Sequence, residues 1–196
     1  MNTKISLAIL AVVALVVGAI LFFNRSDADP QALASQGGKV TVVEYLDLEC
    51  PACGAAFPGV EKLRSEYGDK VDFQLRHFPL PMHRNAEQAA VAVEAAGSKR
   101  DEMFHLMYSN QQNWAGKQTS QRETFLGYAR SLGLDIAAFE KAMDDPATLS
   151  KVSAQRTEGA SLGVNSTPTF FVNGTRFEGA PTYAALKKSI DSALAK

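Results

Sequence analysis

Apolar and polar positions after residue 38 follow a pattern that predicts a βαβ unit. Residues 40–46 form an apolar run rich in β-branched side chains, which is typical of a buried strand. Apolar residues at helical spacing predict a helix over residues 52–67, and alternation predicts a second strand over residues 71–78. A strand, a helix and a strand in this order imply a parallel pair joined by a right-handed crossover.

The next part of the chain, from about residue 85 to residue 161, has no convincing strand pattern. Helical spacing is found instead over residues 86–96, 101–112, 122–132, 136–143 and 147–162. Asp135 and Asp145 stand where N-caps are expected, and Pro146 suits a first helical turn. We therefore expect an all-helical stretch.

Strand character returns near the C-terminus, at residues 169–172. Asn173-Gly174 separates this run from residues 175–177, and such a pair between apolar runs is a strong hairpin signal. A helix over residues 183–195 closes the chain. The β-containing pieces are expected to complete one sheet, so the elements predict an α/β fold with a helical insertion.

The N-terminal part of the chain predicts export from the cytoplasm. Residues 5–23 are apolar apart from Ser6 and Gly18, and at about 1.5 Å per residue they almost cross a ~30 Å hydrocarbon core. A signal-peptide apolar region is usually only ~7–15 residues long, so the length favours a retained anchor. The small residues at 26–28 leave a cleaved signal as the alternative. Lys4 precedes the run, which places the N-terminus in the cytoplasm and the domain outside.

The charge and the cysteine content of the chain restrict the classes of function that it can have. The chain of 196 residues is 46% hydrophobic and has a net charge of −1, so it has material for a core but no basic stripe for nucleic acid. Its only cysteines are Cys50 and Cys53. A pair this close is either redox-active or half of a metal site.

The position of the cysteines favours redox chemistry. Cys50 follows the first strand and opens a helix, where free N–H groups and the helix dipole stabilise a thiolate and lower its pKa. Cys53 lies one turn further in and is expected to be the resolving thiol. The alternatives are incidental buried cysteines or a zinc site, but zinc needs four ligands. His77, His83 and His105 do not stand in zinc-finger register with the pair.

Glu44 and the segment before the third strand are further candidates. Burying an ionised carboxylate is costly, so Glu44 in an apolar strand is a candidate proton acceptor for Cys53. The alternative is that it points to solvent at a sheet edge. Pro168 at a strand start is tolerated without special purpose. A cis Thr167–Pro168 bond would present the Thr167 backbone to an extended substrate, but few such bonds are cis.

Residues 42–53, which end in Cys50-Pro51-Ala52-Cys53, together with residues 163–174 resemble the motifs of DsbA-like thioredoxin proteins, in particular the membrane-anchored or exported bacterial members. The resemblance covers residue 39 to the C-terminus. It implies that Cys50 is the exposed nucleophile of a redox disulfide with Cys53, and that Glu44 is the buried acid beneath it. It also implies a cis Pro168, with Thr167 beside it in substrate binding.

The resemblance implies a thioredoxin-like fold with an inserted all-helical domain. The expected division is a cytoplasmic N-terminus (1–4), an anchor or uncleaved signal (5–23), a linker (24–38), a discontinuous thioredoxin-like domain (39–82 and 163–196) and an inserted helical domain (83–162).

The implied function is to introduce disulfides into exported proteins, with their thiols as substrates and a DsbB- or VKOR-type membrane protein as redox partner. No metal or organic cofactor is expected. Ala52 stands where the strongly oxidising type has histidine, so the direction of electron flow stays open. The alternatives are a disulfide reductase or isomerase of the same fold, and a non-catalytic chaperone or binding module.

Overall fold

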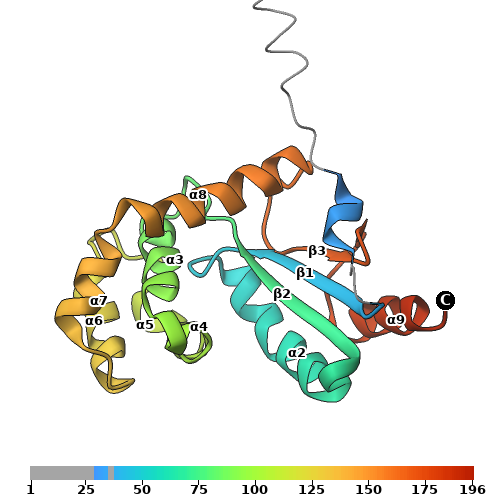
Figure 1. Cartoon of the computed structure of the whole chain (residues 1–196), viewed down its shortest axis with the longest axis horizontal. Helices are drawn as coiled ribbons and strands as arrows, with labels where there is room; N and C mark the ends of the chain where they lie inside the picture. Colours follow the sequence, from blue (N-terminus) through green and yellow to red (C-terminus); the bar gives the residue numbers. More distant parts are fainter. Residues whose placement is uncertain (1–28, 35–37) are drawn as a thin grey trace, which may run out of the picture.

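A mixed four-stranded sheet forms the centre of the structure, a computed structural model that describes residues 29–34 and 38–196 (Figure 1). The strands lie in the order β2-β1-β3-β4. Their bounds are β1 (Val40–Leu46), β2 (Val71–His77), β3 (Thr169–Val172) and β4 (Thr175–Arg176). The parallel pair β1 and β2 is joined through α2 (Pro51–Tyr67), which confirms the predicted βαβ unit. Strand β3 runs antiparallel to both β1 and β4.

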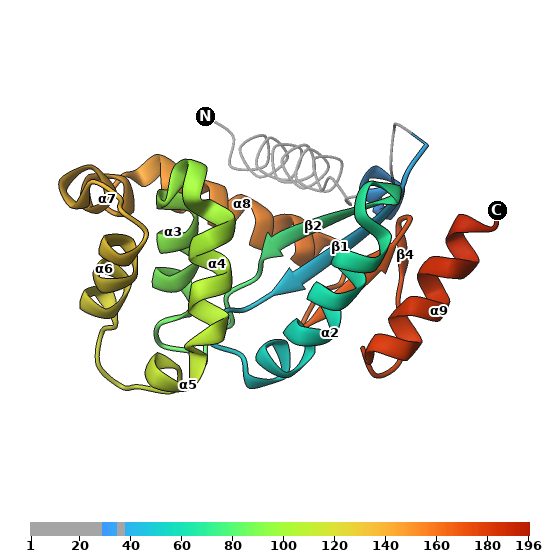
Figure 2. The same cartoon turned by 90° about the horizontal axis from the view of Figure 1, so that it is seen from below.

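Helices cover both faces of the sheet (Figure 2). Helices α2 and α9 (Tyr183–Leu194) cover one face, while α8 (Pro146–Ser161) and η1 (Pro30–Leu33) lie on the other. The period-two pattern of β1 explains this division: Val42 packs with residues of α2 and α9, whereas Val43 and Tyr45 pack with Leu33 and Phe171. Strand β1 is therefore buried on both faces.

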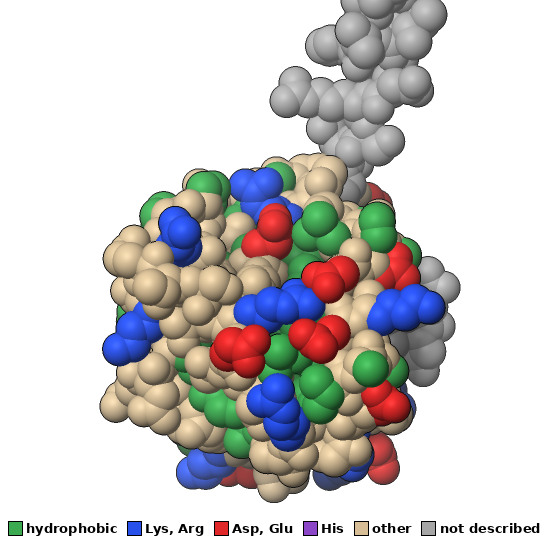
Figure 3. Space-filling view, turned by 90° about the vertical axis from the view of Figure 1, so that its left-hand side faces the viewer, with side chains coloured by type: hydrophobic (Ala, Val, Ile, Leu, Met, Phe, Trp, Pro, Cys, Tyr) green, Lys and Arg blue, Asp and Glu red, His purple; other side chains and the backbone are tan. Residues whose placement is uncertain are grey.

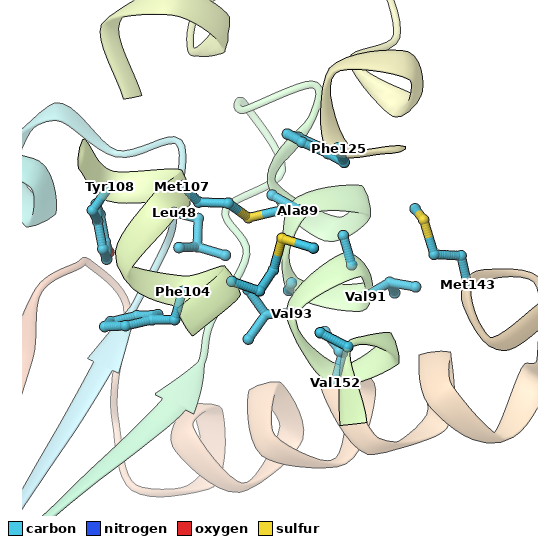
Figure 4. Close-up of a cluster of buried hydrophobic side chains, with 14 of the residues drawn as sticks. Leu48, Ala89, Val91, Val93, Phe104, Met107, Tyr108, Phe125, Met143 and Val152 are labelled. Carbon is cyan, nitrogen blue, oxygen red and sulfur yellow. The ribbon is translucent and has the colours of Figure 1, made fainter. Parts of the chain in front are cut away.

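The segment between β2 and β3 is helical, as predicted, and has its own apolar core (Figure 4). Its helices before α8 are α3 (Ala86–Ala95), α4 (Arg100–Ser109), α5 (Gln111–Trp114), α6 (Arg122–Ser131) and α7 (Ile136–Met143), and short η3 (Gly97–Lys99) joins α3 to α4. Another short helix, η2 (Gly68–Lys70), precedes β2. Leu48, from the turn before Cys50, inserts into this core beside Met107 (Figure 4).

The prediction of one helix over residues 101–112 was wrong, because Asn110 ends α4. The backbone N–H and the side-chain amide of Asn110 both donate to the carbonyl of Leu106, at 3.2 and 2.8 Å, and a new helix begins at Gln111. The other predicted helix starts and the predicted turn are confirmed. Asp135 and Asp145 accept hydrogen bonds from the first turns of α7 and α8, and the turn at Asn173-Gly174 has positive φ angles of 48° and 73°.

The predicted anchor and signal, residues 5–23, lie outside the described residues. Within the described ranges, no helix is long and apolar enough to span a membrane. The end of the molecule formed by α6 and α7 carries acidic and basic side chains side by side (Figure 3). Arg122, for example, binds Asp144 through both terminal nitrogens, each at 2.8 Å. This face thus presents no extended patch of one sign.

Candidate redox site

The two cysteines lie where β1 passes into α2. Cys50 is the N-cap of α2 and Cys53 is in its first turn, and both are free thiols. Cys53 is 1% exposed and Cys50 only 7%, so Cys50 is less exposed than the family resemblance implies. The reason is the neighbouring strand entry, because Cys50 Sγ donates to the carbonyl of Thr167 at 3.5 Å.

The surroundings of Cys50 stabilise its thiolate. Its pKa is lowered from 9.0 to about 5, chiefly because the Cys53 thiol hydrogen-bonds to it. Burial opposes this effect, while Thr167, whose hydroxyl can turn toward the sulfur, and the backbone N–H groups of Cys53 and Ala52 add to it. These N–H groups are the free donors of the helix start.

Glu44 lies within the site rather than at a sheet edge. Strand β1 is a central strand, and Glu44 pairs with Leu75 on one side and Phe170 on the other. It is 8% exposed, so the interpretation that it points to solvent was wrong. Burial raises its pKa to about 8, while the charge of Arg64 opposes the rise and that of Glu61 adds to it. Near neutral pH this carboxyl is thus mostly protonated.

The pKa of the Cys53 thiol depends on both Cys50 and Glu44. Burial raises the pKa of the Cys53 thiol, the hydrogen bond with Cys50 adds to this, and the charge of Glu44 acts in the same direction. The Cys50 thiol therefore ionises easily, whereas the Cys53 thiol stays protonated. This division matches the predicted arrangement of nucleophile and resolving partner.

The Thr167–Pro168 peptide bond is cis. Thr167 is 9% exposed, and its buried hydroxyl has no hydrogen-bond partner among the described residues. That hydroxyl is therefore free to turn toward the thiolate of Cys50. The structure thus brings the predicted residues together: Thr167 contacts Cys50, and the pKa of Cys53 responds to both Cys50 and Glu44.

An apolar groove of about 530 Å³ runs from the dithiol along α2, and the sequence reasoning missed it. It is lined by Ala52, Ala55, Ala56, Gly59, Pro168, Ala180, Pro181, Thr182 and Tyr183. The signal was the small residues at positions 52, 55, 56 and 59, which share one face of a helix. The groove has room for an apolar side chain of a bound peptide next to Ala52 and Pro168.

Buried polar residues before Cys50 were also missed. Asp47 is 1% exposed and accepts hydrogen bonds from the backbone of Glu49 and Leu80 and from the ring of His83, at 2.7, 2.9 and 2.7 Å. Glu49 is 3% exposed and accepts from the backbone N–H of Asn85 at 2.6 Å. These acids stand between a strand and a helix in the sequence, which was the available signal.

The histidines take separate positions. His77 binds Glu94 at 3.0 Å, His83 binds Asp47 at 2.7 Å, and His105 binds the half-buried carboxylate of Glu61 at 2.6 Å. Across residues 29–34 and 38–196, no group of His, Cys, Asp and Glu side chains is arranged to hold a metal ion.

A family model described as thioredoxin matches residues 32–192. The chain belongs to the thioredoxin family. Among curated proteins, this thioredoxin-family chain is 39% identical over 160 residues to the Na(+)/H(+) antiporter NhaA 1 of Salinispora arenicola, which covers 80% of the chain and 23% of that protein. The chain thus spans about a quarter of the length of the curated relatives it matches.

Solved structures extend the likeness to the DsbA-like branch of the fold. The alpha-DsbA1 protein from Wolbachia pipientis superposes with a TM-score of 0.73 at 19% identity, covering 83% of this chain and 89% of that one. A thioredoxin-like oxidoreductase from Silicibacter pomeroyi DSS-3 gives 0.66 at 27% identity, covering 88% and 99%. The predicted thioredoxin-like fold of DsbA type, with its helical insertion, is thereby confirmed.

Proposed function

We propose that this thioredoxin-family protein introduces disulfides into exported proteins through a Cys50–Cys53 redox centre. The observation that carries the proposal is the place of Cys50 at the start of α2 and against Thr167, where the Cys53 thiol and backbone N–H groups lower its pKa to about 5. Stabilising the thiolate stabilises the reduced protein, and a protein with a stable reduced form is an oxidant in its disulfide form. Ala52 thus does not remove the oxidising character, because Cys53, Thr167 and backbone N–H groups supply the stabilisation.

The proposed reaction starts from the Cys50–Cys53 disulfide. A substrate thiolate attacks Cys50 Sγ, forms a mixed disulfide with it and displaces Cys53. A second substrate thiolate then attacks the substrate sulfur of the mixed disulfide and displaces Cys50 as a thiolate. The substrate loses two electrons and gains a disulfide, while the protein gains the same two electrons as a reduced dithiol.

Glu44 serves as the proton donor and acceptor for Cys53 in this scheme. Its pKa of about 8 keeps it mostly protonated near neutral pH, so it is able to protonate Cys53 as that sulfur leaves the disulfide. In the reverse direction the carboxylate accepts the proton again. Thr167 and the apolar groove beside Pro168 would hold the extended chain that carries the substrate cysteines.

The location and the redox partner complete the proposal. Residues 5–23 would hold the domain outside the cytoplasm as a single-pass anchor, or release it after cleavage. Disulfides persist in that compartment. Reoxidation of the dithiol would need a membrane redox partner of the DsbB or VKOR type.

The decisive experiment combines an exchange assay with a redox titration. A model peptide with two cysteines should be oxidised by the wild-type disulfide form and should stay reduced with Cys50→Ala. When the oxidised peptide is supplied instead, the Cys50 thiolate of Cys53→Ala should attack its disulfide and accumulate as a mixed disulfide, because no Cys53 is present to resolve it. An unchanged rate with Cys50→Ala would refute the redox assignment. Equilibration with glutathione separates the directions: an oxidase gives a potential well above that of cytosolic thioredoxin, ≈ −270 mV, whereas a reductase gives one near or below it.

The chaperone alternative predicts a different result. A non-catalytic binding module would suppress aggregation of a reduced, unfolded substrate and would leave its thiols unchanged. Both measurements on one substrate therefore distinguish the proposed oxidase from a reductase and from a binding module.

A further inference from the structure

The segment of residues 108–116, at the end of α4 and through α5, lies against the turn that leads to Cys50. Tyr108 donates from its hydroxyl to the carbonyl of Asp47 at 3.3 Å. The backbone N–H of Gly116 donates to the carboxylate of Glu49 at 2.9 Å. The inserted helices thus contact the redox turn directly, through polar groups as well as through the side chain of Leu48.

Gln111 makes the central contact of this set. Its side-chain nitrogen donates to the carbonyl of Leu48 at 2.8 Å and to that of Cys50 at 2.9 Å. The Cys50 carbonyl also accepts the first helical hydrogen bond of α2, from Gly54 at 3.1 Å. One carboxamide therefore holds the backbone on both sides of residue 49, immediately before the reactive sulfur.

Gly54 makes room for this carboxamide. A Cβ atom at position 54 would overlap Oε1 of Gln111 and would lie 2.9 Å from its Cδ. Glycine in a helix interior is normally less stable than alanine, so its presence in the first turns of α2 calls for a reason. The reason in this structure is the close approach of the Gln111 side chain.

We propose that Gln111 is a positioning residue for the dithiol, which fixes the turn of residues 48–50 and with it the place of Cys50 Sγ against Thr167. The inference rests on the proposed function for its catalytic consequence, but not for its effect on the Cys50 thiol. In this role the helical insertion acts on the redox centre through the Gln111 carboxamide and the backbone that it holds.

The physical reason is electrostatic as well as steric. Carbonyl oxygens carry partial negative charge, and an N–H donor directed at them reduces the repulsion they exert on a neighbouring thiolate. Loss of the donor also frees the turn to move Cys50 away from its own stabilising donors. Both effects disfavour the thiolate, so the Cys50 thiol should ionise at higher pH and the disulfide should become less oxidising.

The test uses the full-length reduced protein with two independent perturbations. Gln111→Met keeps the length of the side chain and removes the donor, while Gly54→Ala keeps the donor and displaces it. Each should raise the measured pKa of Cys50 by about 0.5–1 unit. Each should also lower the equilibrium constant for reduction of the Cys50–Cys53 disulfide by glutathione by about three- to tenfold. The pKa is read from the ultraviolet absorbance of the thiolate as a function of pH.

A double variant supplies the internal control. Gln111→Ala removes the carboxamide that a Cβ atom at position 54 would overlap. Adding Gly54→Ala should therefore shift the pKa of Cys50 no further than Gln111→Ala alone does. Gly127→Ala, in an open position on α6, should leave the pKa unchanged.

A folded Gln111→Met protein with the wild-type Cys50 titration would overturn the proposal, as would full additivity in the double variant. If Gln111→Met fails to fold, Gly54→Ala decides the question by the same titration. Because that titration needs no substrate, it is independent of the exchange assay. An inactive wild-type protein would refute the proposed function and leave the role of Gln111 intact.

Discussion

At the scale of single residues, the site is organised by burial acting on neighbouring acids and thiols. Burial holds Glu44 neutral and Cys53 protonated, whereas Cys50 at the helix start is ionised readily. Burial raises the pKa of all three groups, but at Cys50 the hydrogen bonds from the Cys53 thiol and from the N–H groups of the helix start outweigh it. Each of these environments can be tested separately.

Replacing Glu44 with glutamine should stabilise the protein, and the gain should depend on pH. The folded-state pKa of about 8 exceeds the ordinary value of 4.5, so the stability of the native state is full below pH 4.5 and falls as pH rises toward 8. Glu44→Gln removes that loss, so the free energy of unfolding should rise by about 3 kcal/mol at pH 7 and should change little below pH 4.5. Urea unfolding of the reduced protein across this range measures it.

The surface substitution Glu140→Gln is the matched control for that series. Glu140 is exposed at the edge of α7, and its replacement should change stability by less than about 0.5 kcal/mol. A gain from Glu44→Gln that is equal at pH 4 and pH 8 would contradict the assignment of a raised pKa to Glu44. The exchange rate of Glu44→Gln should fall, since Cys53 loses its proton donor.

Replacing Thr167 with valine should raise the pKa of Cys50. The thiol of Cys53 is the main source of the low value, but Thr167 also contributes, and valine has nearly the same shape without the hydroxyl. We expect Cys50 to titrate about half a unit to one unit higher in Thr167→Val than the wild-type value of about 5. Thr167→Ser retains the hydroxyl and should titrate like the wild type; equal titration of both variants would exclude the hydroxyl as a donor.

At the scale of elements, close packing of α8 on the sheet depends on Gly159. A Cβ atom at this position would lie 2.8 Å from the ring of Tyr45 and 2.9 Å from that of Phe78, so an added methyl group forces the layers apart. Gly159→Ala should therefore destabilise the protein by about 1–3 kcal/mol. Gly127→Ala, which meets nothing within 4 Å, should stabilise it by up to about 1 kcal/mol through helix propensity. Thermal unfolding of both variants measures the contrast, and equal shifts would contradict it.

The elements themselves could be predicted from sequence because they depend on local patterns. The β-branched run of β1, the caps Asp135 and Asp145 and the Asn173-Gly174 turn are all read within a few residues. The break at Asn110 was missed, since an asparagine side chain that ends a helix looks like any other polar helical residue until its hydrogen bond is seen.

The site could be predicted only in part, for the same reason. Cys50 and Cys53 are only three positions apart in the sequence, and Thr167 and Pro168 were found by family resemblance. Gln111 was not found, because its partners lie about sixty residues earlier in the chain and no local pattern links them. Burial decided the interpretation of Glu44, and burial depends on which strand becomes central.

At the scale of the whole molecule, the turn before Cys50 joins the sheet to the helical insertion. Leu48 packs into the helical core, and Glu49 accepts backbone hydrogen bonds from Asn85 and Gly116 at 2.6 and 2.9 Å. The redox centre therefore lies at the junction of the two parts rather than on one of them. A consequence is that the parts should unfold together.

Trp114 makes this consequence measurable. It is the only tryptophan, it lies in the helical part with 0% exposure, and its fluorescence reports that part alone, whereas far-ultraviolet circular dichroism reports all helices and strands. For the wild type we expect coincident urea transitions by both probes, as a single cooperative unit requires. Separate wild-type transitions would show that the helical insertion folds independently of the sheet.

Glu49→Ala should weaken this cooperativity. The substitution leaves the backbone N–H groups of Asn85 and Gly116 without their acceptor. The loss should be about 1–3 kcal/mol, because Asn85 is buried and an unpaired buried donor costs about that much, whereas Gly116 is exposed and can bond to water. The donors belong to the helical part, so the Trp114 transition should move to lower urea than the transition seen by circular dichroism. Glu140→Ala, which removes only an exposed ion pair with Arg122, should keep the transitions together and nearly unshifted. Coincident transitions in Glu49→Ala would place the coupling between the two parts in apolar contacts such as that of Leu48 instead of in the Glu49 hydrogen bonds.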